Sequence, residues 1–280
     1  MHRKEIARDT LQILDQGGYQ APDGPYVDLA SLLAACVENT ECYDPDMLAG
    51  IRDEVLAQPP EFDGTVIEVV NETSLQGSSR LSASQEHGRV GVLNFASARN
   101  PGGGFINGAQ AQEETLARSS GLYPSLLKCR GNYNYHRRHR SGLYSDRMIF
   151  SPGCPVFRRD DGALLEHPYL VDFITSPAPN AGSVRRNQPS LTGKIEGVLR
   201  ERASKVLALA VHHRCDGLVL GAWGCGVFRN DPAMVAGAFH DLLVPDDAPY
   251  RGRIRTVLFS VLDTSESQRT YRTFTDCFAA

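Results

Sequence analysis

Three consecutive glycines and a pair of glutamates stand close together in this sequence. Gly102-Gly103-Gly104 follow an apolar segment at residues 90–95, and Gln112-Glu113-Glu114 begin after seven further residues. Consecutive glycines let the backbone approach a ligand closely and turn its N–H groups toward an anion. A glycine triplet alone is more typical of a flexible loop. Its place between a strand end and a helix start, where open α/β sheets bind ligands, favours a ligand-binding loop.

The two adjacent glutamates allow two interpretations. Glutamates are common in the solvated first turn of a helix, where the helix dipole favours them. Neighbouring residues of a helix diverge by ~100°, so Glu113 and Glu114, if both are functional, are expected to do different jobs. One could hold a sugar hydroxyl while the other protonates a leaving oxygen.

A second glycine-rich segment, GAWGCGVF at residues 221–228, also follows an apolar strand pattern. Its G-x-x-G-x-G order differs from the G-x-G-x-x-G of dinucleotide-binding folds, and no Walker A loop is present. By residue type alone Phe228 is more typical of a core, and Cys225 is not expected to be a nucleophile because no base lies nearby in the sequence. The two loops together predict a diphosphate held between two backbone cradles, with a glycosidic bond presented to a carboxylate.

The elements that must position these loops are apolar strands alternating with helices. The predicted strands are residues 65–70, 89–95, 148–151, 169–175, 217–221 and 256–261, with helices at 191–212 and 232–242. An Asp-Asp-Gly turn at 160–162 predicts a hairpin. This alternation predicts an α/β fold with a mixed or largely parallel sheet covered on both faces. The first part of the chain, residues 1–62, carries helical periodicity and is interpreted as an N-terminal helical extension forming one compact unit with residues 63–280.

Composition excludes several classes of protein. The chain has 280 residues, 41% hydrophobic and 22% charged, which is ordinary globular usage. It lacks the ~18 consecutive apolar residues of a membrane span, and its N-terminus lacks the apolar region of a signal peptide. A net charge of -4 does not suit a globally basic nucleic-acid coat. Seven cysteines without a Cys-x-x-Cys pair predict a reduced cytoplasmic protein.

Three weaker signals remain. Residues 133–140, YNYHRRHR, form the densest basic and aromatic cluster, which could steer a polyanion or lie on a solvated loop. Arg185-Arg186 are a smaller basic pair of the same kind. The spacing of His212, His213 and Cys215 does not fit zinc, so no metal is expected.

The motifs together resemble a known family. The GGG-x7-QEE string resembles the signature of poly(ADP-ribose) glycohydrolases, and NFASARNPGGG, SPGCPVFRRDDG, FITSPAPN and GAWGCGVFRNDP resemble the microbial branch. The likeness covers nearly the whole chain. It implies a macrodomain, a three-layer α/β/α sandwich that binds ADP-ribose, with an N-terminal helical elaboration. It further implies hydrolysis of ribose–ribose O-glycosidic bonds without a cofactor.

The resemblance also implies roles for individual residues. Glu114 matches the catalytic glutamate that protonates the departing 2′-oxygen and then assists attack by water, and Glu113 matches the glutamate that orients the adjoining ribose. Ligand binding is expected from the two loops and their neighbours, namely Asn100, Gly102, Gly103, Gly104, Gln112, Gly224, Cys225, Gly226, Val227 and Phe228. Glu72, after the strand at 65–70, is the candidate for the adenine amino group, against the alternative of a solvated loop residue.

The expected partners are ADP-ribose, poly(ADP-ribose) and poly(ADP-ribosyl)ated proteins, with no membrane association and no direct DNA binding. The alternatives are a macrodomain that binds ADP-ribose without hydrolysis, a hydrolase that removes single ADP-ribose units from proteins and, more remotely, a nucleotide-sugar phosphatase. A binding module needs only the glycine loops, so the glutamate pair favours the glycohydrolase.

Overall fold

A seven-stranded mixed sheet forms the centre of the molecule. The computed structural model describes residues 2–22 and 24–279. The strand order is β3-β6-β7-β5-β8-β9-β4, with β5, β7, β8, β9 and β4 parallel and β3 and β6 antiparallel to their neighbours. These strands are β3 Glu41–Tyr43, β4 Val66–Val70, β5 Val90–Phe95, β6 Met148–Arg158, β7 Leu164–Ser176, β8 Gly217–Leu220 and β9 Thr256–Ser260.

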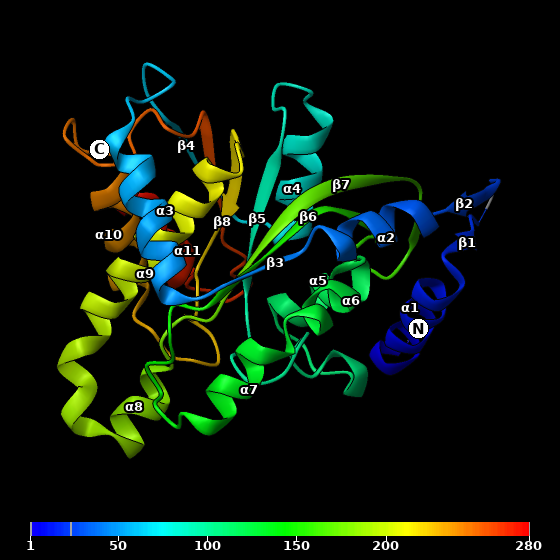
Figure 1. Cartoon of the computed structure of the whole chain (residues 1–280), viewed down its shortest axis with the longest axis horizontal. Coiled ribbons are helices and arrows are strands. Elements are labelled where there is room, and N and C mark those ends of the chain that lie inside the picture. Colours follow the sequence, from blue (N-terminus) through cyan, green and yellow to red (C-terminus); the bar gives the residue numbers. More distant parts are fainter. Residues whose placement is uncertain (1, 23, 280) are drawn as a thin grey trace.

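Helices cover both faces of this sheet (Figure 1). One face packs against α3 Pro45–Ala57, α9 Ile195–His212, α10 Pro232–Leu243 and α11 Arg269–Phe278 in the larger hydrophobic core. The other face packs against α2 Ala30–Glu38, α4 Ser74–Ala83, α5 Gln112–Ser119, α6 Leu122–Lys128 and α7 Arg130–Arg138. The predicted three-layer α/β/α sandwich around a mixed sheet is therefore confirmed.

Local sequence signals explain where several helices begin. Asp44 caps α3, its side chain accepting hydrogen bonds from the N–H groups of Asp46 and Met47. Thr73 and Gln76 form a reciprocal capping box at the start of α4. Asp231 caps α10 with proline at the next position, where a missing N–H costs nothing.

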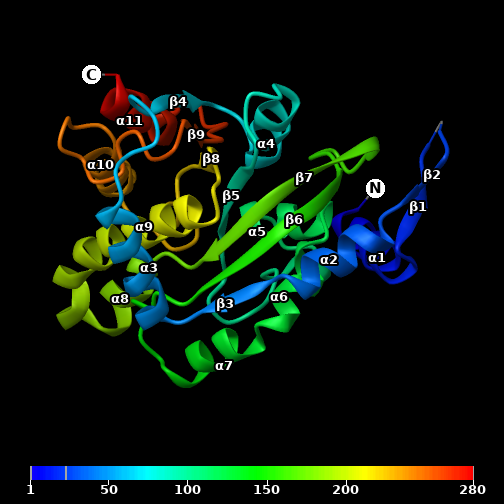
Figure 2. The same ribbon diagram turned by 45° about the horizontal axis from the view of Figure 1, so that its top comes forward.

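The N-terminal segment contains strands as well as the predicted helices. Helix α1, Arg3–Gln16, leads into a two-stranded hairpin of β1 Gly18–Gln20 and β2 Tyr26–Asp28. The short β3 then pairs with β6, so this segment supplies the edge strand of the main sheet (Figure 2). The three helices predicted within residues 1–62 are present, but the short strands between them were not predicted, because three-residue strands are too short to carry an alternating pattern. The division at residue 62 stays a prediction.

All six predicted strands are present, but β6 and β7 are longer than the predicted 148–151 and 169–175, because they continue to the 160–162 turn. Four parallel strands begin and end within one residue of their predicted limits, and the 160–162 turn joins β6 to β7 with Gly162 at φ +92°. Helix α8, Ala181–Asn187, and two 3-10 helices, η1 Phe105–Asn107 and η2 Pro189–Lys194, complete the chain. The basic segment at 133–140 does not form a loop rim, because most of it lies on α7.

One cysteine pair departs from the expected reduced state. Cys42 and Cys129 form a disulfide with their Cα atoms 5.7 Å apart, joining β3 to the junction of α6 and α7. The sequence offered no sign of this pairing, because 87 positions separate the two cysteines. The other five cysteines are free thiols.

Candidate active site

The predicted site residues gather at the carboxyl ends of the parallel strands. Parallel strands β4, β5, β8 and β9 end there together, and ligands of open α/β sheets bind at this edge. The strand ends are close-packed, since a Cβ added to Gly221 would lie 3.1 Å from the ring of Phe95 and still closer to the carbonyl oxygen of Ser260. The two glycine loops therefore leave adjacent strands side by side.

The first glycine loop is built around backbone shapes that favour glycine. Gly102 and Gly103 have φ values of +68° and +59°, in the left-handed region. The N–H of Gly103 donates to the carbonyl of Asn100 over 3.0 Å, which closes the turn. A Cβ on Gly103 would collide with the Glu114 carboxylate and lie 3.2 Å from Glu113 Oε2. The two glutamate side chains leave α5 in different directions, yet both carboxylates lie next to Gly103.

Glu113 is buried at the start of α5. Its side chain is 3% exposed, and Oε2 accepts a 2.6 Å hydrogen bond from the N–H of Ser97. Asn94 on β5 donates to Oε1 over 3.4 Å and is itself tied to Thr175 on β7. Burial raises the pKa of Glu113 to about 8 against the opposing effect of the Ser97 hydrogen bond, and the nearby Glu114 charge raises it further.

Glu114 faces the glycine loop instead of the core. It is partly exposed, and its Oε1 accepts a 3.0 Å hydrogen bond from the N–H of Gly104. The first glycine loop thus holds one carboxylate oxygen of Glu114, and the other oxygen is left for a ligand. The two adjacent glutamates therefore occupy different environments, as the expectation of separate tasks requires.

Gln112 ties the start of α5 to its surroundings. Its Oε1 accepts from the N–H of Phe95 over 2.8 Å, and its Nε2 donates to the carbonyl of Leu93 and to Ser74 Oγ. Both ends of the amide are thus occupied by the protein. Asn100 is exposed beside the glycines.

The second glycine loop is packed against the protein at its first residues and exposed to solvent at its later ones. Trp223 is buried and donates from Nε1 to the carbonyl of Ser176 over 3.0 Å. Gly224 has φ +71°, and a Cβ there would collide with the Asn230 amide. A Cβ on Gly226 would meet nothing within 4 Å, and Val227 is 80% exposed. The loop is therefore packed at Gly224 and open to a ligand at Gly226 and Val227.

Cys225 and Phe228 complete this loop. Burial raises the pKa of the Cys225 thiol to about 12, so the thiol stays protonated, consistent with the expectation that it is no nucleophile. Phe228 packs against the larger core, with its ring 5.8 Å from that of Tyr144.

A contact between the two loops was missed by sequence reasoning. His136, on α7, approaches the carbonyl of Ala98 with Nδ1 at 3.1 Å, and Ser145 N–H donates to its Nε2. Burial lowers the pKa of His136 to about 4, so the neutral ring donates at Nδ1 and accepts at Nε2. Its ring also packs on Tyr144, which in turn packs on Phe228. No periodicity or motif in the 133–140 segment pointed to this link.

Glu72 lies at the same edge, after β4. Its carboxylate pairs with Arg80 over 3.0 Å, and Ser260 Oγ donates to it over 3.4 Å. Its side chain is only 13% exposed. Glu72 is therefore held through one carboxylate oxygen, at the end of the sheet that carries the glycine loops.

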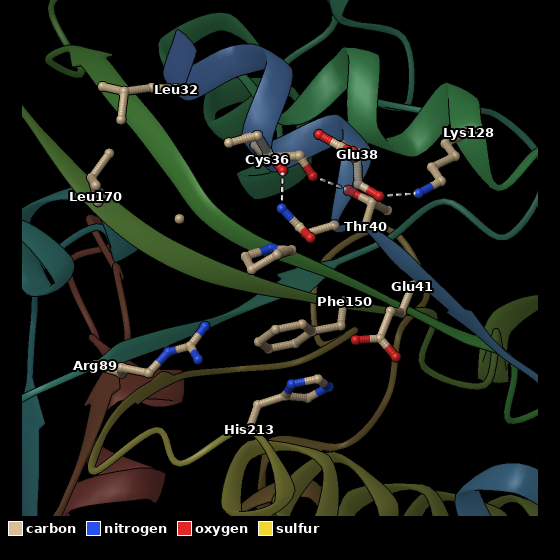
Figure 3. Close-up of a pocket in the computed structure, with 14 residues that line it drawn as sticks. Leu32, Cys36, Glu38, Thr40, Glu41, Arg89, Lys128, Phe150, Leu170 and His213 are labelled. Carbon is tan, nitrogen blue, oxygen red and sulfur yellow. Dashed lines mark hydrogen bonds between the residues drawn. The ribbon is translucent and has the colours of Figure 1, made fainter.

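A separate cavity of about 790 Å³ opens at the opposite edge of the sheet (Figure 3). Arg89 and Lys128 flank it, and Phe150 stacks on His213 with ring centroids 3.5 Å apart. None of the predicted site residues lines this cavity.

Within residues 2–22 and 24–279, no three His, Cys, Asp or Glu side chains come close enough to hold a metal ion. Over the same residues, no helix combines the length and apolar character needed to cross a membrane.

Comparison with known proteins gives a consistent result. The model of the microbial-type PARG catalytic domain, where PARG denotes poly(ADP-ribose) glycohydrolase, matches residues 7–159. The PARG of Thermomonospora curvata is 48% identical over 99% of both chains, with a TM-score of 0.94, and its complex with the inhibitor ADP-HPD gives 0.91. The Deinococcus radiodurans PARG in complex with ADP-ribose is 42% identical over 88% of this chain and 96% of that one, with a TM-score of 0.82.

No curated protein matches the chain. The family model nevertheless covers more than half of the sequence, and the solved structures match in both sequence and fold. The chain belongs to the microbial-type poly(ADP-ribose) glycohydrolases, which are glycoside hydrolases acting on poly(ADP-ribose).

Proposed function

We propose that this glycohydrolase cleaves the ribose–ribose bond of poly(ADP-ribose) with Glu114 as general acid and base, releasing ADP-ribose. The observation that carries this assignment is the placement of Glu114, partly exposed and hydrogen-bonded to the N–H of Gly104. A group that exchanges protons with both substrate and water must be accessible to both, and Glu113, with 3% exposure, offers water no access.

The reaction needs one proton moved twice. The Glu114 carboxyl group donates its proton to the departing 2′-oxygen as the glycosidic bond breaks and the ribose gains oxocarbenium character. Water then attacks the anomeric carbon and gives its proton to the Glu114 carboxylate. The acid is thereby restored, and the products are ADP-ribose and a shortened polymer.

Glu113 is proposed to orient the ribose next to the cleaved bond. Its position is fixed by Ser97 and Asn94, which suits a group that holds substrate in one geometry. At neutral pH the raised pKa of Glu113 keeps this carboxyl largely protonated, so it adds little negative charge beside Glu114. Gln112 is proposed to support the pair from behind, since its own hydrogen bonds are made to the protein.

The diphosphate and distal ribose are proposed to lie between the two glycine loops. The backbone of Gly102, Gly103 and Gly104 would line one side by close approach, since the N–H groups of Gly103 and Gly104 already bond to Asn100 and Glu114. The N–H groups of Gly224, Gly226 and Val227 would face the other side, with Cys225 between them. Phe228 would pack on the terminal ribose, and Asn100 would hydrogen-bond to it. Glu72 would accept a hydrogen bond from the adenine amino group, which requires the Arg80 pair to leave one carboxylate oxygen free.

The substrate in the cell is proposed to be poly(ADP-ribosyl)ated protein in the cytoplasm, bound without direct contact to DNA. Five of the seven cysteines are free thiols, the state that a reducing compartment favours, whereas the Cys42–Cys129 disulfide is the one feature that such a compartment does not favour. Cell fractionation tests the location, and a gel-shift assay with duplex DNA tests the last point.

The products distinguish this proposal from its rivals. Purified protein is incubated with polymer-modified acceptor, and soluble and protein-bound products are resolved. Release of monomeric ADP-ribose with a mono-modified acceptor left behind is expected. Complete removal of the last unit would indicate a mono-ADP-ribosyl hydrolase, and binding of ADP-ribose without release would indicate a non-hydrolytic macrodomain.

A further inference from the structure

Six exposed arginines gather beside the second glycine loop. They come from the end of α7, from α8 and from the residue after Phe228, and we call them the arginine surface: Arg137, Arg138, Arg140, Arg185, Arg186 and Arg229. Two of the weaker basic signals in the sequence, about 45 positions apart, thus contribute to one region of the fold.

Hydrogen bonds join the segments that carry these arginines. The N–H of Asn180, just before α8, donates to the carbonyl of Gly142 over 2.8 Å, and the N–H of Gly142 donates to Gln188 Oε1 over 2.7 Å. Arg185 Nη1 donates to the carbonyl of Arg229 over 3.2 Å. Helices α7 and α8 accordingly lie at the same end of the sheet (Figure 1).

The charge of these arginines is not neutralised by the protein. None of the six forms an ion pair with any described residue, whereas seven other arginines of the chain do: Arg52, Arg80, Arg89, Arg158, Arg200, Arg202 and Arg251. The two nearest acidic groups in the sequence are engaged elsewhere, because Asp146 pairs with α9 and Asp231 caps α10. In a chain of net charge -4, this is a local excess of positive charge.

The arginine surface is continuous with the active site. The N–H of Gly182 on α8 donates to the carbonyl of Phe228 over 2.9 Å, so α8 begins against the second glycine loop. Helix α7 reaches the first loop through the hydrogen bond between His136 and Ala98. A polymer whose terminal unit lies between the loops can therefore extend directly onto this surface.

We propose that the arginine surface binds the diphosphates of ADP-ribose units adjacent to the one being cleaved, so that it selects long polymer over short. The inference rests on the proposed function. Each unit of the polymer carries two phosphates, and the arginine fork matches phosphate oxygens in bidentate fashion.

A single-stranded nucleic acid is the other polyanion with bases and phosphates. The location favours poly(ADP-ribose), because the surface begins at the loop proposed to hold its terminal diphosphate. A surface for an unrelated nucleic acid would need no connection to Phe228 or Ala98.

The test removes charge at three arginines whose side chains form no hydrogen bond or ion pair with the described residues. The variant is Arg138→Gln/Arg140→Gln/Arg186→Gln. Its control is Arg8→Gln/Arg159→Gln/Arg214→Gln, which removes the same charge from exposed arginines on α1, the β6–β7 turn and the opposite edge of the sheet. Hydrolysis is measured on an ADP-ribose dimer and on purified long polymer at several salt concentrations.

The triple variant is expected to hydrolyse the dimer with the wild-type kcat and a KM raised by no more than about twofold, because the dimer offers the arginine surface only one adjacent diphosphate. Its KM for long polymer should rise about tenfold at low salt, and the slope of log KM against log salt should fall by about 2, since each lost phosphate contact removes ~0.7. The control should match wild type on both substrates. An unchanged KM for long polymer, or an equal rise in the control, would overturn the proposal.

Two other results are distinguishable. If wild type cleaves neither substrate, the proposed function fails first. If a single-stranded RNA binds wild type and loses affinity in the triple variant while KM for polymer stays constant, the surface serves nucleic acid and the proposal is wrong.

Discussion

Glu113 and Glu114 are neighbours in sequence but differ in what surrounds their carboxyl groups. Glu113 is enclosed and hydrogen-bonded to Ser97, whereas Glu114 is partly exposed and hydrogen-bonded to Gly104. Both carboxyls approach Gly103, so two full negative charges there would repel each other. The burial of Glu113 relieves this repulsion because it favours the neutral form of that side chain.

The raised pKa of Glu113 predicts a pH-dependent stability. Between pH 4.5 and about 8 the folded protein holds a proton on Glu113 that the unfolded chain releases. The contribution of this group to the free energy of unfolding is therefore complete below pH 4.5 and is lost as the pH rises to about 8. Each unit of pKa difference corresponds to about 1.4 kcal/mol.

Denaturant unfolding of wild type and Glu113→Gln at pH 5, 6.5 and 8 measures this effect. The stability of wild type relative to Glu113→Gln should fall as the pH rises, whereas the exposed control Glu166→Gln should follow wild type throughout. Parallel pH profiles for wild type and Glu113→Gln would show that Glu113 titrates normally.

At the scale of elements, the site depends on how the strand ends meet the helix starts. The strands and both glycine loops were predictable because alternation of apolar segments and glycine spacing are local signals. The roles of His136 and Tyr144 were not, because their contacts with Ala98 and Phe228 join segments far apart in the chain. Gly103 shows the same division, since its left-handed backbone follows from the triplet but its contact with two carboxylates follows from the packing of α5.

Gly103→Ala is expected to abolish most activity because Gly103 contacts both glutamate carboxylates. Alanine at φ +59° costs ~1–2 kcal/mol of stability, and its Cβ would displace the Glu114 carboxylate, which should reduce kcat/KM by roughly 100-fold or more. Gly153→Ala is the matched control, because Gly153 has φ +54° with nothing within 4 Å of the added Cβ.

Both variants should lose similar stability, measured by thermal unfolding, and only Gly103→Ala should lose activity. Equal activity in the two variants would mean that the glutamates tolerate displacement. Inactivity of both would attribute the effect to general strain.

At the scale of the whole molecule, the N-terminal segment is part of the sheet as well as a cover for it. Strand β3 pairs with β6, and the disulfide from Cys42 to Cys129 ties this edge strand to the helices that carry His136. The α/β/α architecture and the family were predictable from alternation and motifs. The edge strand and the disulfide were not, because a three-residue strand has no periodicity and a pairing across 87 positions depends on the finished fold.

Cys42→Ser is expected to destabilise the oxidised protein. A bridge closing a loop of this length typically contributes 2–4 kcal/mol by restricting the unfolded chain. Unfolding of wild type, Cys42→Ser and the free-thiol control Cys277→Ser is compared with and without a dithiol reductant. The Cys42→Ser deficit should disappear in reductant. A deficit that persists there would show that packing of the serine is responsible, and no deficit in either condition would exclude a stabilising bridge.

The most direct test of the account is the separation of binding from catalysis at Glu114. Glu114→Gln keeps the shape of the side chain and its hydrogen bond to Gly104 but cannot donate and recover a proton at neutral pH. We predict a loss of kcat/KM on poly(ADP-ribose) of at least ~100-fold, with the Kd for ADP-ribose within about threefold of wild type, because the cradling loops are untouched. Retention of wild-type kcat/KM by Glu114→Gln would contradict the central claim and return the acid role to Glu113.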